Sequence, residues 1–550
     1  MNSGKGFVRN TAVMFAAMLI SKALGAVLKI PLGNILGGEG MGYFTTAYSI
    51  FTPVLAFVCS GIPAVLTRSV AGYAAAGKYG MIRKARRCSL VMALIVGLAG
   101  TALIFAAAVP FVCFAANSPE SLPSVLIIAP ATLFCSVTAV YRGYYEGLSD
   151  MLPTGLSQVI EATVRAGVGV GLSYFVYANG ERLFGSQSAA LPYAAAAAVL
   201  GVTVSEVCGT VFMLLRSRRK ADSFRDSGEK MTGDEIIEMC RDIMRKALPV
   251  SLGAAASGFI AFAEMMTVTN CVDLSANLFG GYWASDNILS VIKEKYTGAG
   301  NFMYGCYAGI TMSVYMLAAS APGVIGRCEL PRLAASAGTD SPDVLRREIK
   351  LLIKGTAVIA APVTLFLAVL AEPVLRILYP DRVTEAAVGA LPLAVLGAGG
   401  LAPALLGAVF VIFHAFGDFG TPVKVTLIGG AVKLVLSAAF IVIPQLNITG
   451  AALASVISDV ICLVYSVKAI KKRFGMSTGC IRYSLPAVFA AVSGGVGIYL
   501  FFRAFEESIG TLPAVLVSAA VGTVICALVL FIYDSADCAA VIRLLRRRKT

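Results

Sequence analysis

The chain has 550 residues, of which 58% are hydrophobic and only 14% are charged, and its mean hydropathy is +0.81. This composition excludes a large water-soluble protein and predicts a polytopic membrane protein. The formal net charge of +14 would suggest a nucleic acid partner in a soluble protein, but here the basic residues lie in short loops between apolar segments. We therefore assign them to contacts with anionic membrane lipids and expect no nucleic acid partner.

Apolar runs of about 20 residues predict about fourteen membrane-spanning helices. These helices are expected to start near residues 11, 43, 88, 122, 156, 190, 247, 300, 351, 386, 423, 450, 483 and 511. With a cytoplasmic N-terminus, about 35 of the 45 lysines and arginines fall on the inner side. The positive-inside rule therefore places both termini in the cytoplasm.

The first predicted span, 11–30, contains Lys22 near its centre and Lys29 seven residues later. A lysine at the middle of a membrane helix costs roughly 2.5 to 3.5 kcal/mol on insertion scales, so it is expected to face a bundle interior or a wet cavity. Seven residues are close to two helical turns, which places both ammonium groups on one face, about 10 Å apart. This face indicates an interior that binds a negatively charged group.

The second and eighth predicted spans align without a gap, so that Tyr48 matches Tyr307 and Pro63 matches Pro322. A second correspondence relates the region of Arg165 to that of Lys433 in the same order. Six helices separate each matched pair, and an even number restores the direction of the chain. The halves are therefore predicted to be parallel repeats around a site near the membrane midplane. We divide the chain into an N-lobe at 1–246, a C-lobe at 247–480 and a C-terminal part at 481–550 with the last two helices.

The fifth span places Glu161 and Arg165 four residues apart on one helical face. An intrahelical salt bridge is one interpretation, and a cation in the interior is the other. Lys433 in the eleventh span has no acid at helical spacing, so it needs a partner from another helix, from water or from a ligand. Its match to Arg165 would provide one cation from each half.

Acidic residues are fewer and less central in the predicted spans. Glu264 and Asp459 are the deepest, followed by Glu206, and each is predicted either to bind a coupling cation or to hold a lysine in place. Glu39 in the sequence GGEG is interpreted either as part of a gate segment or as a solvated turn. The single histidine, His414, is interpreted as an interfacial turn residue.

The sequence offers no catalytic or metal-binding constellation. Thirteen cysteines are scattered without C-x-x-C pairs and are predicted to be small core residues. Neither a G-x-x-x-x-G-K-[ST] nor an H-E-x-x-H pattern is present. We therefore expect neither an enzyme nor a cofactor nor a bound structural metal.

Three stretches of the chain carry a family resemblance. The residues ISKALGAVLKIPLGNILGGEGMGYFTTAYSIFTPVLAFVCSGIPAVLTRSVAGY resemble the stage V sporulation protein B and polysaccharide-export branch of the multidrug/oligosaccharidyl-lipid/polysaccharide superfamily. The stretches YRGYYEGLSDMLPTGLSQVIEATVR at 141–165 and HAFGDFGTP at 414–422 resemble the same branch. Related lipid II flippases use cations of helix 1, and Lys22 and Lys29 match those positions. The further arginines that those flippases carry in helix 2 are missing here before Arg68.

The resemblance implies two six-helix lobes around a central cavity, two extra C-terminal helices, and alternating access in the bacterial cytoplasmic membrane. It implies a flippase that exports a lipid-linked saccharide diphosphate, with Lys22 and Lys29 as substrate contacts. The depth of Arg165 and Lys433 in their spans adds these two residues as further candidate contacts on a cationic path. Glu39, Glu161, Glu264 and Asp459 are assigned to gating or to coupling with sodium or protons, and a monomer is expected. The alternatives are a cation-coupled multidrug exporter and a membrane scaffold in wall or spore-cortex assembly.

Overall fold

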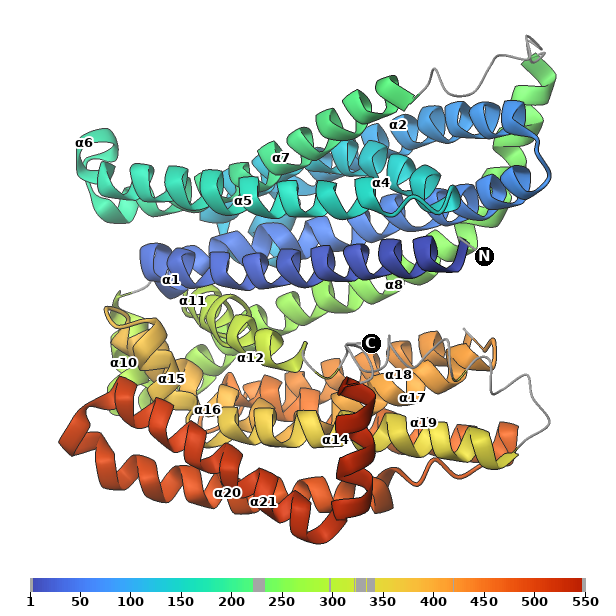
Figure 1. Cartoon of the computed structure of the whole chain (residues 1–550). Helices are drawn as coiled ribbons and strands as arrows, with labels where there is room; N and C mark the ends of the chain where they lie inside the picture. The colour runs from blue at the N-terminus through green and yellow to red at the C-terminus, as the bar shows by residue number, and fades with distance from the viewer. Residues whose placement is uncertain are drawn as a thin grey trace. The chain divides into compact units, whose positions relative to one another are not determined.

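The computed structural model describes residues 3–220, 233–295, 298–320, 322, 333, 342–418 and 420–546. Within these ranges, the description excludes the side chains at 3–23, 26–27, 218–220, 233–236, 295, 342 and 534–546. Every regular element in the described residues is a helix, which confirms the prediction of an all-α fold. Figure 1 shows long helices joined by short connections.

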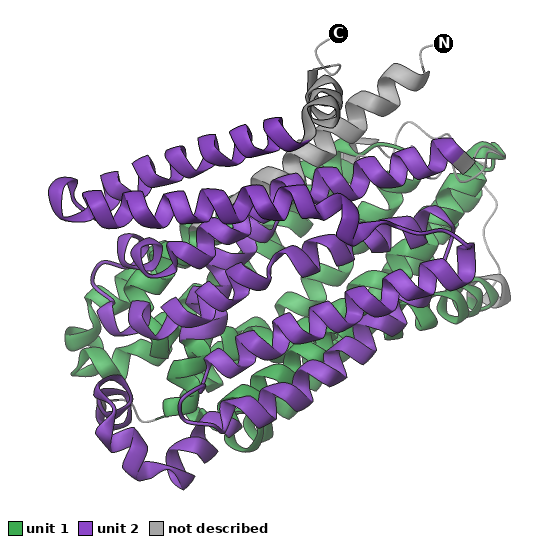
Figure 2. Cartoon of the chain, turned by 90° about the horizontal axis from the view of Figure 1, so that it is seen from below, with its two compact units in different colours: residues 1–270, 295–305 green, residues 271–294, 306–550 purple. Residues whose placement is uncertain are grey.

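Contacts divide the chain into two compact units, which Figure 2 shows in two colours. The first unit comprises residues 1–270 and 295–305, and the second comprises 271–294 and 306–550. The first boundary lies within a helix, 24 residues after the lobe boundary that we expect from the sequence. The division at residues 246 and 480 therefore stays a prediction.

The first unit is built around a bundle in which α5 packs along α1 and α7, and α4 packs against α1 and α2. Its elements are α1 (Ser3–Ala75), α2 (Tyr79–Pro110), η1 (Phe111–Ala115), η2 (Pro119–Ser121), α3 (Leu122–Ile128), α4 (Ala131–Gly147), α5 (Leu152–Ala178), α6 (Gly180–Phe184), α7 (Gln187–Lys220), most of α8 (Gly233–Leu278) and α11 (Ala299–Tyr304).

In the second unit α18 packs on α19, and the last two helices pack on each other and on α14. Its elements are the last residues of α8, α9 (Gly280–Ser285), α10 (Asn287–Lys295) up to residue 294, η4 (Gly305–Thr311) from residue 306, α12 (Met312–Ala319), α14 (Pro342–Val369), α15 (Ala371–Leu378), α16 (Val383–Gly399), α17 (Leu401–Ala415), α18 (Gly420–Ile441), α19 (Thr449–Phe474), α20 (Cys480–Ile509) and α21 (Thr511–Arg546). The two C-terminal helices thus belong to the same compact unit as α14.

Helix α1 contains two of the predicted spans, because Gly37 interrupts its helical geometry with φ 64° and ψ −169°. Glycine adopts this backbone conformation without the steric penalty that a side chain would bring. The described residues contain 12 helices long and apolar enough to span a membrane, or 13 when the bent pair α16 and α17 is counted as one span. This number is close to the predicted fourteen.

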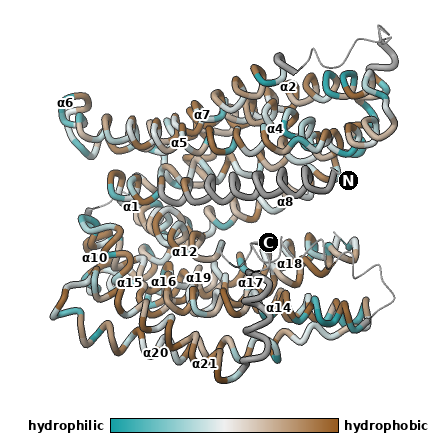
Figure 3. Tube along the Cα trace, viewed as in Figure 1, coloured by the Kyte–Doolittle hydropathy of each residue, from teal (hydrophilic) through white to brown (hydrophobic). Residues whose placement is uncertain are grey.

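The outward faces of the helices are apolar, as a lipid environment requires. In α2 the side chains of Ile95 and Leu98 are 63% and 61% exposed. Figure 3 shows hydrophobic residues along the lengths of the helices and hydrophilic residues at helix ends and short connecting elements such as α6. Large exposed apolar surfaces are unusual in soluble proteins, so the structure agrees with a multi-pass membrane protein.

Glycines bring the start of the eighth predicted span against α1 in the first unit. A Cβ atom at Gly305 would overlap the carbonyl oxygen of Gly38 and lie 2.5 Å from the amide nitrogen of Gly42. The amide of Asn301 donates a hydrogen bond to the carbonyl oxygen of Glu39 at 3.1 Å beside this contact. The helix backbones therefore touch directly, with no room for a methyl group.

The substitution Gly305→Ala is expected to lower the thermal unfolding midpoint, because the new methyl group meets backbone atoms that cannot move aside. Overpacking of this kind costs typically 1 to 3 kcal/mol. The measurement is thermal unfolding of the purified protein in detergent. Gly253→Ala in α8 is the matched control, since no atom lies within 4 Å of a Cβ there. Equal midpoints for the two variants would contradict the close backbone contact.

Asp418 lies in the connection between α17 and α18, within the stretch HAFGDFGTP, and its side chain has a structural role there. Its carboxylate accepts the backbone N–H of Thr421 at 3.0 Å and the hydroxyl of Thr421 at 2.7 Å, which caps α18. Arg473, near the end of α19, donates to the same carboxylate. Burial opposes ionisation, but the hydrogen bonds from Thr421 and the charge of Arg473 together lower the pKa of Asp418 below its usual value. The half-buried His414 lies in the last turn of α17, one turn before Asp418.

Asp418→Asn is expected to lower the unfolding midpoint at neutral pH and to have less effect in acid. The folded-state pKa lies below the unfolded value of about 3.9, so the stabilisation is present above about pH 4 and is lost as the pH falls through the folded pKa. Unfolding midpoints of both proteins between pH 7 and pH 3 measure this difference. Asp381→Asn in an exposed loop is the control. A difference that stays constant down to pH 3 would contradict the assignment.

Candidate functional site

The first buried ion pair of the first unit joins α4 to α5. Nη2 of Arg142 donates to both carboxylate oxygens of Glu161, at 2.6 and 2.7 Å, and its Nε donates to the hydroxyl of Ser157 at 3.0 Å. The Arg142 side chain is 23% exposed, whereas that of Glu161 is 8% exposed. Glycine at position 209 of α7 leaves the space that Glu161 occupies, since a Cβ there would overlap its carboxylate.

The second ion pair joins α5 to α7. Nη2 of Arg165 donates to Glu206 at 2.7 Å, and Nε of Arg165 donates to the hydroxyl of Ser205 at 3.4 Å. Again the arginine side chain is the more exposed partner, at 29% against 9% for that of the acid. Close approach of Gly169 and Gly201 allows α5 and α7 to pack near this pair.

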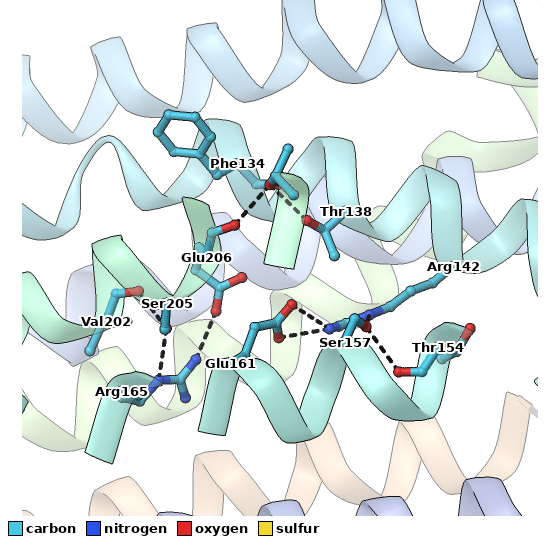
Figure 4. Close-up of polar contacts among 11 residues, drawn as sticks. Phe134, Thr138, Arg142, Thr154, Ser157, Glu161, Arg165, Val202, Ser205 and Glu206 are labelled. Carbon is cyan, nitrogen blue, oxygen red and sulfur yellow. Dashed lines mark hydrogen bonds and ion pairs between the residues drawn. The ribbon is translucent and has the colours of Figure 1, made fainter. Parts of the chain in front are cut away.

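The intrahelical salt bridge between Glu161 and Arg165 is therefore a wrong interpretation. Each residue instead pairs with an opposite charge on a neighbouring helix (Figure 4). A pair four residues apart on one helix contributes only about 0.2 to 0.5 kcal/mol. A buried arginine and carboxylate on different helices form stronger charge-assisted hydrogen bonds, which replace the lost contacts with water.

Arg142 is a site residue that the analysis of single spans missed. Its partner lies on the next helix, and no spacing rule along one helix relates them. The signal that could have indicated it is its place in YRGYYEGLSD, one of the stretches that carry the family resemblance. Threonines extend the polar contacts, since the hydroxyls of Thr138 and Thr210 lie 2.8 Å apart between α4 and α7.

The two lysines of the first span differ in what the structure describes. Lys22 belongs to α1, but its side chain lies outside the described residues. Lys29 is half-buried. Within the described part of the chain, no hydrogen bond or ion pair to its ammonium group is found. Lys29 is thus a cation inside an apolar span that other described side chains do not neutralise.

Lys433 and Asp459 lie in the second unit on the adjacent helices α18 and α19, and both are half-buried. In the same unit, Tyr307 belongs to the π-helical turn η4. Its hydroxyl lies 3.4 Å from the hydroxyl of Ser455 on α19. Turns of this type often occur at functional sites.

The remaining predicted acids lie in the first unit. Glu39 is half-buried in the first turn after the break at Gly37, and it accepts a hydrogen bond from the hydroxyl of Tyr43 at 2.9 Å. This placement excludes the solvated turn and leaves the role in a gate as a prediction. Glu264 is half-buried in α8. Among the described residues, no group of three His, Cys, Asp or Glu side chains could hold a metal ion.

Comparison with known families decides the relationship. The family described as "Polysaccharide biosynthesis protein" matches residues 7–302, which is more than half of the chain. The chain belongs to the polysaccharide biosynthesis protein family. The family described as "Lipid II flippase MurJ" matches residues 317–518, in the second half of this family member.

Two curated relatives cover nearly the whole chain of this polysaccharide biosynthesis protein. It is 21% identical over 508 residues to stage V sporulation protein B of Bacillus subtilis, which covers 91% of both chains. It is also 21% identical over 535 residues to lipid II flippase MurJ of the same organism, covering 94% of this chain and 93% of the relative. These matches confirm the relationship that the sequence motifs indicate.

Solved structures share the fold of this family member. An inward closed conformation of lipid II flippase MurJ matches with a TM-score of 0.66 at 13% identity, covering 95% of this chain and 98% of that one. An inward-facing multidrug resistance MATE family transporter of the MOP superfamily matches with a TM-score of 0.64 at 15% identity, covering 84% and 98%. At these identities the likeness concerns the fold, which this chain shares with both transporters.

Breaking the pair of Arg142 and Glu161 is expected to destabilise the first unit strongly. Arg142→Met leaves a buried carboxylate without its partner, which typically costs about 3 to 5 kcal/mol. The double variant with Glu161→Met removes both charges and should recover most of this loss. Thermal unfolding of the two single variants and the double variant measures the coupling. Additive effects of the two substitutions would contradict a direct pair.

Proposed function

We propose that this protein is a flippase that exports a lipid-linked saccharide across the bacterial cytoplasmic membrane by alternating access. Membership of the polysaccharide biosynthesis protein family supports this proposal. The names of the two relatives that cover nearly the whole chain support it as well, since one is a lipid II flippase and the other a stage V sporulation protein. The substrate would be a saccharide joined to a polyprenyl lipid, such as undecaprenol, through a diphosphate.

The observation that carries the proposal is Lys29. It is half-buried in an apolar span and has no ion-pair partner among the described residues. A charge in this position is expensive unless something compensates it. A diphosphate provides about two negative charges and accepts strong charge-assisted hydrogen bonds from lysine. Lys22, two helical turns away on the same face, would be the second contact.

The ion pairs change the roles that we propose for the other cations. Arg165 is neutralised by Glu206, so its charge is less available to a diphosphate than that of Lys29. Lys433 lies on α18, which packs on α19, the helix of Asp459, and it would contribute from the second unit. We propose Glu264 or Asp459 for coupling to sodium or protons and Glu39 for the gate, whereas Glu161 would hold Arg142 in place.

The proposed activity is transport without covalent chemistry on the substrate. The lipid tail would stay in the bilayer while the diphosphate and saccharide cross through the protein. A multidrug exporter would instead bind an organic cation, which the positive charge of Lys29 would repel. We propose a monomer as the transporting species.

Lys29→Ala is expected to weaken binding of undecaprenyl diphosphate carrying one N-acetylglucosamine by about tenfold or more. A hydrogen bond to a charged group contributes about 1.5 to 3 kcal/mol, and 1.4 kcal/mol corresponds to a factor of ten. Lys29→Arg should retain most of the affinity because it keeps the charge. Binding to purified protein in nanodiscs is measured by native mass spectrometry, with Lys468→Ala on the exposed face of α19 as control.

Transport in proteoliposomes with the same variants completes this test. The flippase proposal predicts parallel losses of binding and of lipid translocation in Lys29→Ala. Saturable binding of tetraphenylphosphonium without binding of the lipid would favour the multidrug exporter. Binding without translocation under any ion gradient would favour a scaffold. Unchanged lipid affinity in Lys29→Ala would remove this residue from the site.

A further inference from the structure

The two arginines of the first unit have hydrogen-bonding capacity that their ion pairs do not use. Arg142 employs Nε and Nη2, and so does Arg165. In the described part of the chain, neither Nη1 has a hydrogen-bond partner. Each Nη1 carries two N–H donors. The arginine side chains are also the more accessible members of their pairs, at 23% and 29% exposure, while the acid side chains are 8% and 9% exposed.

The charge of this cluster selects the kind of ligand that it fits. Two guanidinium groups and two carboxylates have a formal net charge of zero. A free anion would bind there only weakly, because the carboxylates repel it while the guanidinium groups attract it. An organic cation would also bind weakly, because the guanidinium groups repel it while the carboxylates attract it. Sugar hydroxyls are neutral and both donate and accept hydrogen bonds. The cluster therefore suits a neutral polyol better than it suits a diphosphate or a drug cation.

Tyr48 of α1 adds an aromatic surface to the same cluster. Its ring is half-buried, and α1 packs along α5 and α7, the helices that carry Arg165 and Glu206. In the described residues this hydroxyl has no hydrogen-bond partner. Phe44 and Phe51 lie with their ring centroids 4.9 and 6.2 Å away and hold the ring in place. An aromatic face packs against the apolar C–H face of a sugar ring, while planar guanidinium groups contact its hydroxyls.

The donors of the cluster are fixed before any ligand binds. Ser157 and Ser205 accept hydrogen bonds from Nε of Arg142 and Arg165, so each guanidinium is held by two side chains. The hydroxyl of Ser157 in turn donates to the carbonyl oxygen of Thr154 at 2.9 Å. Figure 4 shows the two guanidinium groups on either side of the Glu161 carboxylate. Groups held in this way lose little conformational entropy when a ligand binds.

We propose that Arg142, Arg165 and Tyr48 form a subsite for the saccharide of the substrate, separate from the diphosphate contact at Lys29. This inference rests on the proposed function, since it assigns one part of the lipid-linked substrate to these residues. Arg165 can donate hydrogen bonds to sugar hydroxyls even though Glu206 neutralises its charge. Glu161 and Glu206 act as positioning residues that orient the two arginines.

The test compares two ligands that differ only in the sugar. The probes are undecaprenyl diphosphate and the same lipid with one N-acetylglucosamine, and the dissociation constants are measured in nanodiscs by native mass spectrometry. The ratio of the two constants gives the contribution of the sugar. For the unchanged protein we expect the glycosylated lipid to bind about tenfold more tightly, as one or two hydrogen bonds to charged groups would provide.

Arg165→Lys keeps a positive charge beside Glu206 but removes the planar fork and its free Nη1. We expect the ratio to fall to about one to threefold while the affinity for the bare lipid stays the same. Tyr48→Leu should lower the ratio in the same way, and Tyr48→Phe should retain part of it because the ring remains. Arg182→Lys, on the exposed surface of α6, is the matched control and should leave both constants unchanged.

The outcomes separate this inference from the proposed function. Equal binding of both lipids by the unchanged protein would overturn the saccharide subsite and leave the flippase proposal in place. Binding of neither lipid would overturn the flippase proposal and the subsite with it. Equal loss of both lipids in Arg165→Lys would overturn the assignment, because it would mean that the arginine serves the diphosphate or the fold. If Arg165→Lys fails to fold, Tyr48→Leu decides by the same ratio.

Discussion

Charges inside apolar helices need partners, and this requirement organises the first unit of the protein. Water is scarce there, so an unpaired charge loses its hydration without compensation. Arg142 and Arg165 are compensated by Glu161 and Glu206, and these two pairs tie α5 to α4 and to α7. The helix that carries both pairs also packs along α1. The two ion pairs thus connect α4, α5 and α7, which all pack on α1, and they hold the hydrogen-bond donors of both arginines in fixed orientations.

Close helix packing is the second condition for these contacts. Charged side chains of this length reach one another only if their helices come close, and glycines allow it. Gly209 leaves space for Glu161, and Gly169 meets Gly201 between α5 and α7. Elsewhere in the unit, Gly305 lies against the backbone at Gly38. Small residues at such contacts are typical of membrane helices, since lipid gives no hydrophobic driving force for helix association.

The predicted repeat clarifies what is particular to each half. In the predicted repeat Arg165 on α5 corresponds to Lys433 on α18, and an acid lies on the next long helix after each of them, Glu206 on α7 and Asp459 on α19. At the offset of the repeat Arg142 aligns with Ile412 on α17, so it has no basic counterpart. The pair of Arg142 and Glu161 is therefore not one that the repeat predicts in the second unit.

The sequence by itself determined the class of the fold, the approximate number of spans and the family. Long apolar runs, the glycine break before Glu39 and the motifs of α1 and α5 are local signals, and each depends on residues close together in the chain. It also identified Lys29, since a lysine within an apolar run is visible without coordinates. Only the tertiary structure decided the partners of Glu161 and Arg165 and revealed Arg142. Ion pairs between helices depend on which helix faces meet and on the space that glycines on other helices leave. The spacing of residues within one span reveals neither of these, so the sequence could not predict the partners.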